Sequence, residues 1–188
     1  MTEKLTWLRV PTEDELPQEV LDLWQPSIEK LGFVPNVLRL YALRPSRLLA
    51  WNAHYEEAMK GDSALTKAER EMIAVVVSVT NSCAYCIAAH SAALRKLTKD
   101  PALADQIAAE HARADIPDRM KHALDYAVKL TRSPARMVED DVRLLRDSGW
   151  SDEDVMDIAE VTALFNFSNR MASGLGWAPN PEYETLGR

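Results

Sequence analysis

The sequence predicts an all-α fold, a helical bundle, from three observations. Ala, Leu, Glu, Lys and Arg dominate the composition, and these residues favour helices. Only six glycines occur among 188 residues, and four of them lie at or after Gly149. Apolar residues recur at helical spacing along most of the chain. Since 47% of the residues are hydrophobic, we expect a single domain over residues 1–188 with a sizeable core.

The N-terminal part of the chain predicts an arm followed by a helix. Residues 1–12 are expected to be extended. Apolar residues at helical spacing then predict a helix over residues 13–31, which ends at Gly32. The segment GFVPNV, which begins at that glycine, is expected to be a turn.

Two further helices are predicted from their end signals. Pro45 suits a first turn and Gly61 suits a helix end, so residues 45–60 are expected to be helical. Thr66 and Glu69 form a capping-box pattern, which opens a helix that runs through residue 78 or beyond.

The run IAVVVSV at residues 73–79 favours a strand on propensity alone, because it is rich in β-branched residues. Its helical cap and the lack of a partner strand elsewhere favour a fully buried helix instead. Further helices are expected from residue 81 or 82 to 97, and over 101–113, 117–131, 138–147 and 151–173.

A weak internal repeat relates residues 65–86 to residues 150–171. In this alignment the caps Thr66 and Ser151 coincide, and so do an alanine, an isoleucine, a valine and an asparagine in each segment. The second segment has no counterpart of the two cysteines, so only the first copy would retain chemistry. The alternatives are a duplicated two-helix unit and a chance match of two amphipathic helices.

The charge and the ends of the chain exclude several classes of partner. A formal net charge of −7 argues against a nucleic-acid partner, because binding phosphates requires clustered Lys and Arg. The opening segment MTEKLTWLRVPTEDEL has no apolar core of signal-peptide length, and no run approaches the roughly 18 apolar residues of a spanning helix. We therefore expect a cytoplasmic protein with no membrane partner.

The segment NSCAYCIAAH carries the candidate chemistry. Cys83, Cys86 and His90 are three and four positions apart, so on a helix they share one stripe. With Asn81 or Ser82 as the N-cap, both sulfurs would lie in the first turns, where the helix dipole favours a thiolate. We therefore expect a lowered cysteine pKa, and an imidazole that can exchange a proton with the sulfur one turn away.

Glu71 lies directly before the apolar run MIAVVV, where a carboxylate is expected to be paired or to take part in catalysis. A CxxC pair can cycle between dithiol and disulfide without a metal or an organic cofactor, so we expect no cofactor. Two other readings stay open. The cysteines are a pair of small buried side chains, or they bind zinc together with His90, although the sequence offers no obvious fourth ligand.

The full pattern is Glu71, eleven residues, Cys83, two residues, Cys86, three residues and His90. It resembles the signature of the AhpD-like alkylhydroperoxidases of the carboxymuconolactone decarboxylase superfamily. The segments GFVPNVLRLYALRP, LTRSP and FNFSNRMA are similar to the uncharacterised peroxidase-related branch of that family. The likeness covers roughly residues 20–182, with a redox core over about 65–98.

The resemblance implies a role for each member of the pattern. Cys86 would be the peroxidatic cysteine and Cys83 the resolving one, with His90 as the base beside Cys86 and Glu71 at the start of a proton relay. Better-studied members carry a second histidine where this chain has Tyr85. Tyr85 is expected either to line the peroxide pocket or to cover it.

The resemblance also implies a function and its partners. We expect a thiol-dependent hydroperoxide reductase, reset by a dihydrolipoyl or thioredoxin-like dithiol donor and assembled as a homotrimer or homohexamer. The alternatives are a thiol–disulfide oxidoreductase, a redox-sensing or scaffolding oligomer without turnover, and a lactone decarboxylase.

Overall fold

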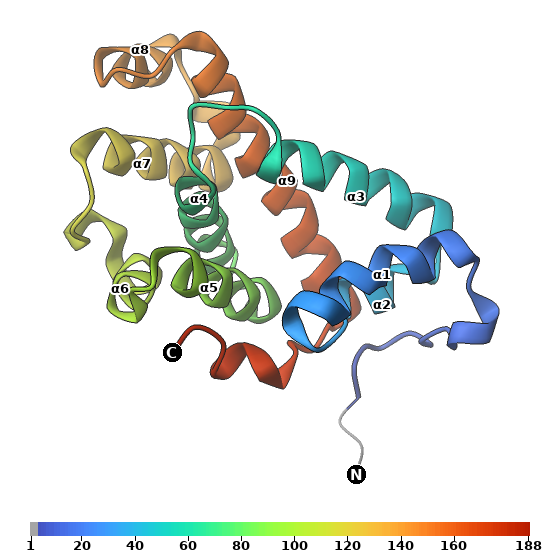
Figure 1. The fold of residues 1–188 in the computed structure, drawn as a ribbon. Helices are drawn as coiled ribbons and strands as arrows, with labels where there is room; N and C mark the ends of the chain where they lie inside the picture. Colours follow the sequence, from blue (N-terminus) through green and yellow to red (C-terminus); the bar gives the residue numbers. More distant parts are fainter. Residues whose placement is uncertain (1–3) are drawn as a thin grey trace.

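The computed structural model describes residues 4–188 as an all-α fold, which confirms the predicted fold class (Figure 1). The α-helices are α1 (Gln18–Leu31), α2 (Asn36–Tyr41), α3 (Pro45–Lys60), α4 (Lys67–Thr80), α5 (Ala84–Thr98), α6 (Pro101–Glu110), α7 (Asp118–Arg132), α8 (Glu139–Asp147) and α9 (Asp152–Leu175). Short 3-10 helices are η1 (Glu13–Glu15), η2 (His111–Arg113), η3 (Pro134–Arg136) and η4 (Pro181–Glu184). Across residues 4–188, no helix combines the length and apolar character that crossing a membrane requires.

Helix α4 lies at the centre of the fold and packs against α5, α7 and α9. Figure 1 shows α5, α6 and α7 on one side of the long α9, and α1, α2 and α3 on its other side. Every residue of α4 from Arg70 to Ser78 is buried. The run IAVVVSV is therefore a helix, as predicted, because helices cover it on all sides and its β-branched side chains fill the core.

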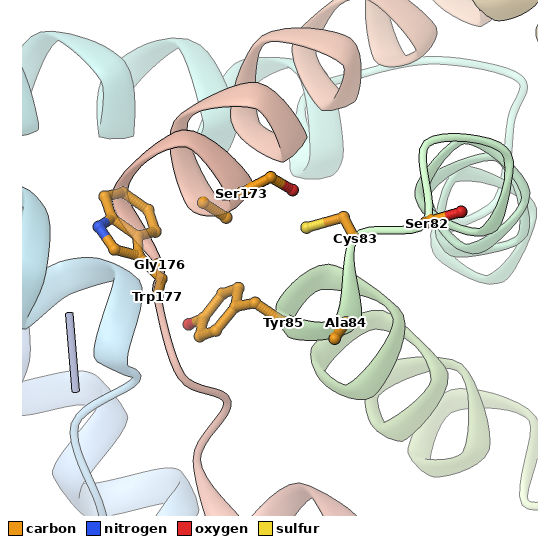
Figure 2. A pocket seen from close by; sticks show the side chains of 8 residues that line it. Ser82, Cys83, Ala84, Tyr85, Ser173, Gly176 and Trp177 are labelled. Carbon is orange, nitrogen blue, oxygen red and sulfur yellow. The ribbon is translucent and has the colours of Figure 1, made fainter. Parts of the chain in front are cut away.

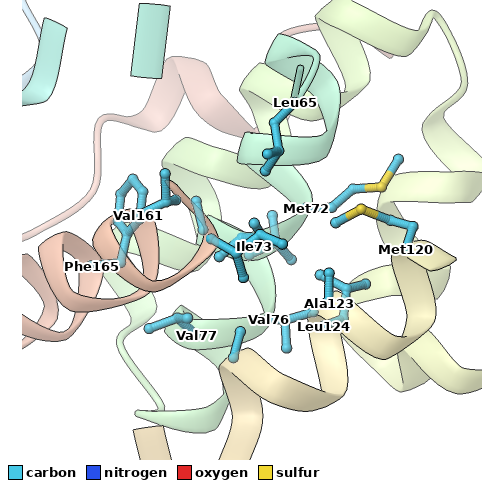
Figure 3. Close-up of a cluster of buried hydrophobic side chains, with 14 of the residues drawn as sticks. Leu65, Met72, Ile73, Val76, Val77, Met120, Ala123, Leu124, Val161 and Phe165 are labelled. Carbon is cyan, nitrogen blue, oxygen red and sulfur yellow. The ribbon is translucent and has the colours of Figure 1, made fainter. Parts of the chain in front are cut away.

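The main hydrophobic core forms where α4, α7 and α9 meet (Figure 3). Ile73 and Val77 of α4, Leu124 of α7 and Phe165 of α9 are all essentially inaccessible to solvent. Burying side chains of this size contributes about 1.5–3 kcal/mol each relative to exposure. This core fixes α9 against α4, and through α4 it sets the position of the segment that carries the cysteines.

The predicted helix over residues 13–31 is wrong in its first third. The chain forms η1, then Leu16 and Pro17 take extended conformations before α1 begins at Gln18. Proline disfavours helical geometry at the residue before it and cannot donate a backbone hydrogen bond, which explains the break. The expected turn at GFVPNV is present at Gly32, where φ is +81°, but Asn36 already begins the short helix α2.

The expected N-terminal arm lies against the end of α9. Residues 1–3 of the arm lie outside the described residues, and residues 4–12 form no helix. The Trp7 amide donates to the Leu175 carbonyl at 3.0 Å, and the Ala178 amide donates to the Leu5 carbonyl at 2.9 Å. These backbone hydrogen bonds hold the arm against the last residue of α9 and against the segment that follows it.

The predicted helix ends are confirmed where capping chemistry is strong. Helix α3 spans residues 45–60 as expected, and Thr66 and Glu69 form the predicted capping box at the start of α4. Helices α6 to α9 lie within a few residues of their predicted ranges, except that α6 ends at Glu110 and η2 continues it to Arg113.

The predicted N-cap of the cysteine helix is wrong by one or two residues. Asn81 ends α4, Ser82 takes a left-handed conformation with φ of +53°, and Cys83 itself is the N-cap of α5. A three-residue connection thus reverses the chain between α4 and α5. As a result Cys83 lies at the N-terminus of α5 and not inside its first turn.

The internal repeat has a structural counterpart in its first half only. Thr66 and Ser151 both begin their helices with a capping box, and Asn81 donates to the Asn166 side-chain oxygen at 3.1 Å. The first segment breaks into α4 and α5, whereas the second continues as the single helix α9. The two segments therefore share a capped helix start, and the second segment does not form a two-helix unit.

Candidate functional site

The two cysteines are free and buried at the start of α5. The Cys83 amide donates to the Ser78 carbonyl at 2.9 Å, which ties the N-cap to the end of α4. Cys86 lies three residues later, so the two side chains fall on one side of the helix terminus. Both side chains belong to one buried cluster, which also contains Tyr85 and Trp177.

A cavity of about 180 Å³ opens beside Cys83 (Figure 2). The start of α5 forms one wall and the C-terminal end of α9 forms the other. The lining residues are Ser82, Cys83, Ala84, Tyr85, Ala172, Ser173, Gly176 and Trp177. Of the two cysteines, Cys83 lines this cavity, which we call the Cys83 cavity, and Figure 2 shows its sulfur directed toward α9.

The two sulfurs differ in acidity. The pKa of Cys83 is lowered to about 6, mainly by a hydrogen bond from the Cys86 thiol. The Cys86 backbone and Ser173 lower it further, and these three effects together outweigh burial, which raises it. The same hydrogen bond, together with burial, raises the pKa of Cys86. Of the two sulfurs, Cys83, which lines the cavity, is therefore the one whose thiolate is favoured.

Glu71 and His90 form a carboxylate–imidazole pair between α4 and α5. The His90 Nδ1 atom lies 2.7 Å from Glu71 Oε2, and both side chains are largely buried. The His90 ring also meets the Phe165 ring edge-to-face, with centroids 4.4 Å apart. Because the carboxylate engages Nδ1, the tautomer it favours leaves Nε2 free to accept a proton.

Tyr85 lines the Cys83 cavity with its ring. Its hydroxyl is directed elsewhere: it accepts from the Val37 amide at 2.8 Å and hydrogen-bonds to Tyr183. The ring also packs edge-on against Trp177, with centroids 6.2 Å apart. Tyr85 therefore shapes the cavity wall with its ring, while its hydroxyl is held by the Val37 amide.

The sequence analysis missed two residues of α9 near the cysteines. Ser173 lines the Cys83 cavity and lowers the pKa of Cys83, and the buried Asn169 acts to lower the pKa of Cys86. They are four positions apart and so share one face of α9. Helix α9 carries many other polar residues, so nothing in its sequence sets these two apart.

The structure thus brings together the four residues of the sequence pattern in two pairs, Cys83 with Cys86 and Glu71 with His90. The redox core expected over about 65–98 corresponds to α4 and α5. Among residues 4–188, no three His, Cys, Asp or Glu side chains come together as a group that could hold a metal ion.

Comparison with known proteins identifies the family. The carboxymuconolactone decarboxylase family matches residues 46–129, a range that includes Glu71, both cysteines and His90. A peroxidase-related protein from Ralstonia eutropha JMP134, described as an alkylhydroperoxidase AhpD core, shares 41% identity with a TM-score of 0.96, over 100% of this chain and 98% of that one. The chain therefore belongs to the carboxymuconolactone decarboxylase family and is AhpD-like.

Two further solved structures have the same fold as this chain. A peroxidase-related protein from Silicibacter sp. TM1040 shares 44% identity with a TM-score of 0.94, over 100% of both chains. The debrominase Bmp8, in complex with 2,3,4-tribromopyrrole, has the same fold with a TM-score of 0.81 at 18% identity, over 99% of this chain and 96% of that one. None of the proteins with curated descriptions matches the chain.

Proposed function

We propose that this protein is a thiol-dependent hydroperoxide reductase that cycles Cys83 and Cys86 between dithiol and disulfide. The observation that carries the proposal is a sulfur of lowered pKa at a cavity, hydrogen-bonded to a second free thiol. Membership of an AhpD-like family with peroxidase-related relatives supports the same activity.

The cycle begins with attack of a cysteine thiolate on one oxygen of the hydroperoxide. A sulfur–oxygen bond forms, the O–O bond breaks, and the alkoxide takes a proton and leaves as an alcohol. The second thiol then loses its proton and attacks the sulfenic sulfur, so that a disulfide forms and hydroxide leaves as water. An external dithiol reduces the disulfide and is itself oxidised.

The geometry supports Cys83 as the attacking sulfur. Cys83 lines the cavity and has the lowered pKa, whereas the pKa of Cys86 is raised. This order is the reverse of the one that the family resemblance implies, in which Cys86 attacks first. The reductase proposal itself does not depend on the order, because either sulfur can capture the sulfenic acid of the other.

The Glu71–His90 pair would accept and return the protons of the cycle. A buried imidazole held at Nδ1 by a carboxylate has a fixed orientation, with Nε2 left to exchange a proton. His90 lies one turn beyond Cys86 on α5, so the thiol that must ionise during disulfide closure is its nearest cysteine along the helix.

A free-thiol count tests the activity and the order of the sulfurs. The reduced protein and the variants Cys83→Ser and Cys86→Ser are each mixed with one equivalent of an alkyl hydroperoxide, and metal content is checked. We expect the wild type to lose both thiols and Cys86→Ser to yield a trapped sulfenic acid at Cys83. A trapped sulfenic acid in Cys83→Ser alone would mean that Cys86 attacks the peroxide first, as the family resemblance implies. Survival of both thiols in the wild type would refute the proposed reductase activity.

A thiol–disulfide oxidoreductase is the second candidate, because a thiolate at an open cavity also suits attack on an external disulfide. The two candidates differ in which oxidant acts faster. Oxidation of the reduced protein by a hydroperoxide and by a small disulfide, compared at equal concentration, separates them. The reductase requires the peroxide to oxidise Cys83 and Cys86 faster.

We also propose a dihydrolipoyl or thioredoxin-like dithiol donor and a homo-oligomeric state, as the family resemblance implies. Exposed apolar side chains on α9 support the oligomer: Met156 is 70% exposed and Phe167 is 47% exposed. Light scattering of the wild type and of Phe167→Glu measures the assembly. A trimeric or hexameric wild type that dissociates on this substitution would support α9 as a contact, and a monomeric wild type would refute the assembly.

A further inference from the structure

The N-terminal arm carries an exposed tryptophan beside the candidate site. Trp7 is 66% exposed, although the arm on either side of it is attached to the protein. The Thr6 hydroxyl donates to the Leu175 carbonyl at 2.7 Å, and the Trp7 amide donates to the same oxygen at 3.0 Å. Leu5 and Val10 pack against the buried cluster that contains both cysteines. The arm is therefore anchored next to the redox pair, with the Trp7 ring directed largely into solvent.

The Trp7 indole packs on Gly176, a residue of the α9 wall of the Cys83 cavity (Figure 2). A Cβ placed on Gly176 would lie 2.3 Å from the nearest indole atom, so the ring fills the space in front of this glycine. The next residue of the arm, Leu8, is also an exposed apolar side chain. Apolar surface left exposed beside a cavity is typical of a ligand-binding region. Trp7 thus adds a flat aromatic surface next to the cavity wall.

The cavity is too small to enclose a large ligand. Its volume is about 180 Å³, whereas pockets that bury a drug-sized molecule measure roughly 300–1,000 Å³. It has room for a compact group such as tert-butyl beside the sulfur, so a larger tail must project out of it. Apart from Cys83, no lining residue carries a charge, and Tyr85 and Trp177 contribute aromatic rings. A tail that suits these surroundings is uncharged and apolar.

We propose that Trp7 is a specificity-determining residue of the Cys83 site, and that its exposed face binds the aromatic tail of an uncharged organic hydroperoxide larger than the cavity. The reactive end of such a ligand lies beside Cys83, and its tail stacks on the indole. The inference rests on the proposed reductase function and adds the class of substrate to it. Burying two facing aromatic surfaces strengthens binding by roughly 10-fold.

The test measures binding without turnover, by using two alcohols that cannot oxidise a thiol. 2-Phenyl-2-propanol has the shape of cumene hydroperoxide, and tert-butanol has the shape of tert-butyl hydroperoxide. Each alcohol is titrated into the reduced Cys86→Ser protein while the alkylation of Cys83 by iodoacetamide is followed. A ligand in the cavity protects the sulfur, so the concentration that halves the alkylation rate measures the affinity.

Three substitutions are compared in this background. Trp7→Ala removes the ring, and Trp7→Phe keeps an aromatic face. Leu8→Ala is the matched control, because it removes the neighbouring exposed apolar side chain of the same arm, which is 47% exposed. The rate of trypsin cleavage after Arg9 verifies that the arm stays attached in each variant, and gel filtration verifies that the oligomeric state is unchanged.

We expect 2-phenyl-2-propanol to protect Cys83 at a lower concentration than tert-butanol does. Trp7→Ala should weaken protection by 2-phenyl-2-propanol by roughly 10-fold and leave protection by tert-butanol unchanged. Trp7→Phe should restore most of the lost affinity, and Leu8→Ala should have no effect on either alcohol.

Four results would overturn the inference. They are an unchanged affinity in Trp7→Ala, an equal loss in Leu8→Ala, faster cleavage after Arg9 in Trp7→Ala, and a changed oligomeric state in Trp7→Ala, which would assign the ring to a contact between copies of this chain. The assay contains no peroxide, so failure of the reductase proposal in the thiol count is a separate result.

Discussion

The Nδ1 atom of His90 lies 2.7 Å from Glu71 Oε2, and this buried contact joins α4 to α5 one turn beyond Cys86. A second carboxylate–imidazole pair, His111 with Asp125, has nearly the same separation of 2.9 Å, but its carboxylate is 61% exposed. The two pairs therefore have nearly the same separation but differ in burial, in position and in the ring nitrogen engaged, which is Nδ1 in His90 and Nε2 in His111. The buried Glu71–His90 pair is therefore a candidate for the site, and the exposed Asp125–His111 pair serves as a control.

Glu71→Gln is expected to slow disulfide formation with an alkyl hydroperoxide by about 10- to 100-fold, because the protonated imidazole loses its buried counter-charge. The measurement is the rate of thiol loss after rapid mixing. Asp125→Asn, which removes the exposed pair, should leave that rate unchanged. Equal rates in the two variants would show that the Glu71 charge plays no part in proton transfer.

Alkylation of Cys83 is expected to follow its lowered pKa of about 6. The thiolate is present above that pH, so the reaction of Cys83 with iodoacetamide falls as the pH drops through 6. In Cys86→Ala the hydrogen bond to the Cys83 sulfur is lost, and the midpoint should move upward toward the ordinary value of 9.0. Cys86→Ser, which keeps a donor, should move it less. A midpoint that is the same in all three proteins would contradict the hydrogen-bond explanation.

Tyr85→Phe is expected to leave the rate of thiol oxidation within about twofold of the wild type, because the tyrosine hydroxyl binds the Val37 amide and Tyr183 rather than a sulfur. Loss of the hydroxyl leaves the Val37 amide without its acceptor and should reduce the free energy of unfolding by about 1–2 kcal/mol. Denaturant titration and the thiol assay measure the two effects separately. A large loss of reactivity at unchanged stability would assign the hydroxyl a chemical role.

Gly176→Ala is expected to destabilise the protein by about 1–3 kcal/mol. Gly176 has φ of +63°, and an added Cβ would lie 2.3 Å from the Trp7 indole. Gly174→Ala on the same helix meets open space and should stabilise by about 0.5–1 kcal/mol. Chemical denaturation of both variants, with tryptophan fluorescence as the signal, checks the pair. Equal effects would mean that the N-terminal arm does not pack on Gly176.

Local signals were sufficient to predict much of the fold. Pro45 with Gly61, and Thr66 with Glu69, fixed helix ends because caps and chain breakers act on their immediate neighbours. The start of α5 was misplaced because the left-handed conformation of Ser82 depends on the tight reversal between two packed helices. Nothing in the residue type of a serine indicates such a conformation.

The sequence pattern named the four residues of the candidate site, and their pairing into Cys83 with Cys86 and Glu71 with His90 is a structural finding. The sequence could not indicate which sulfur faces the cavity, because that depends on where α5 begins. It also could not indicate Asn169, whose partners Ser78 and Asn81 are 91 and 88 positions away along the chain. Contacts of this range arise from tertiary packing and leave no periodic signal.

The two walls of the Cys83 cavity come from different parts of the chain. The wall from α5 lies inside residues 46–129, the part that matches the family, whereas Ala172, Ser173, Gly176 and Trp177 lie beyond it. Substitutions on the α9 wall can therefore alter the size and polarity of the space next to the sulfur while the Cys83–Cys86 pair stays intact. Changes confined to the α9 wall can therefore alter which ligands fit beside the same pair of cysteines.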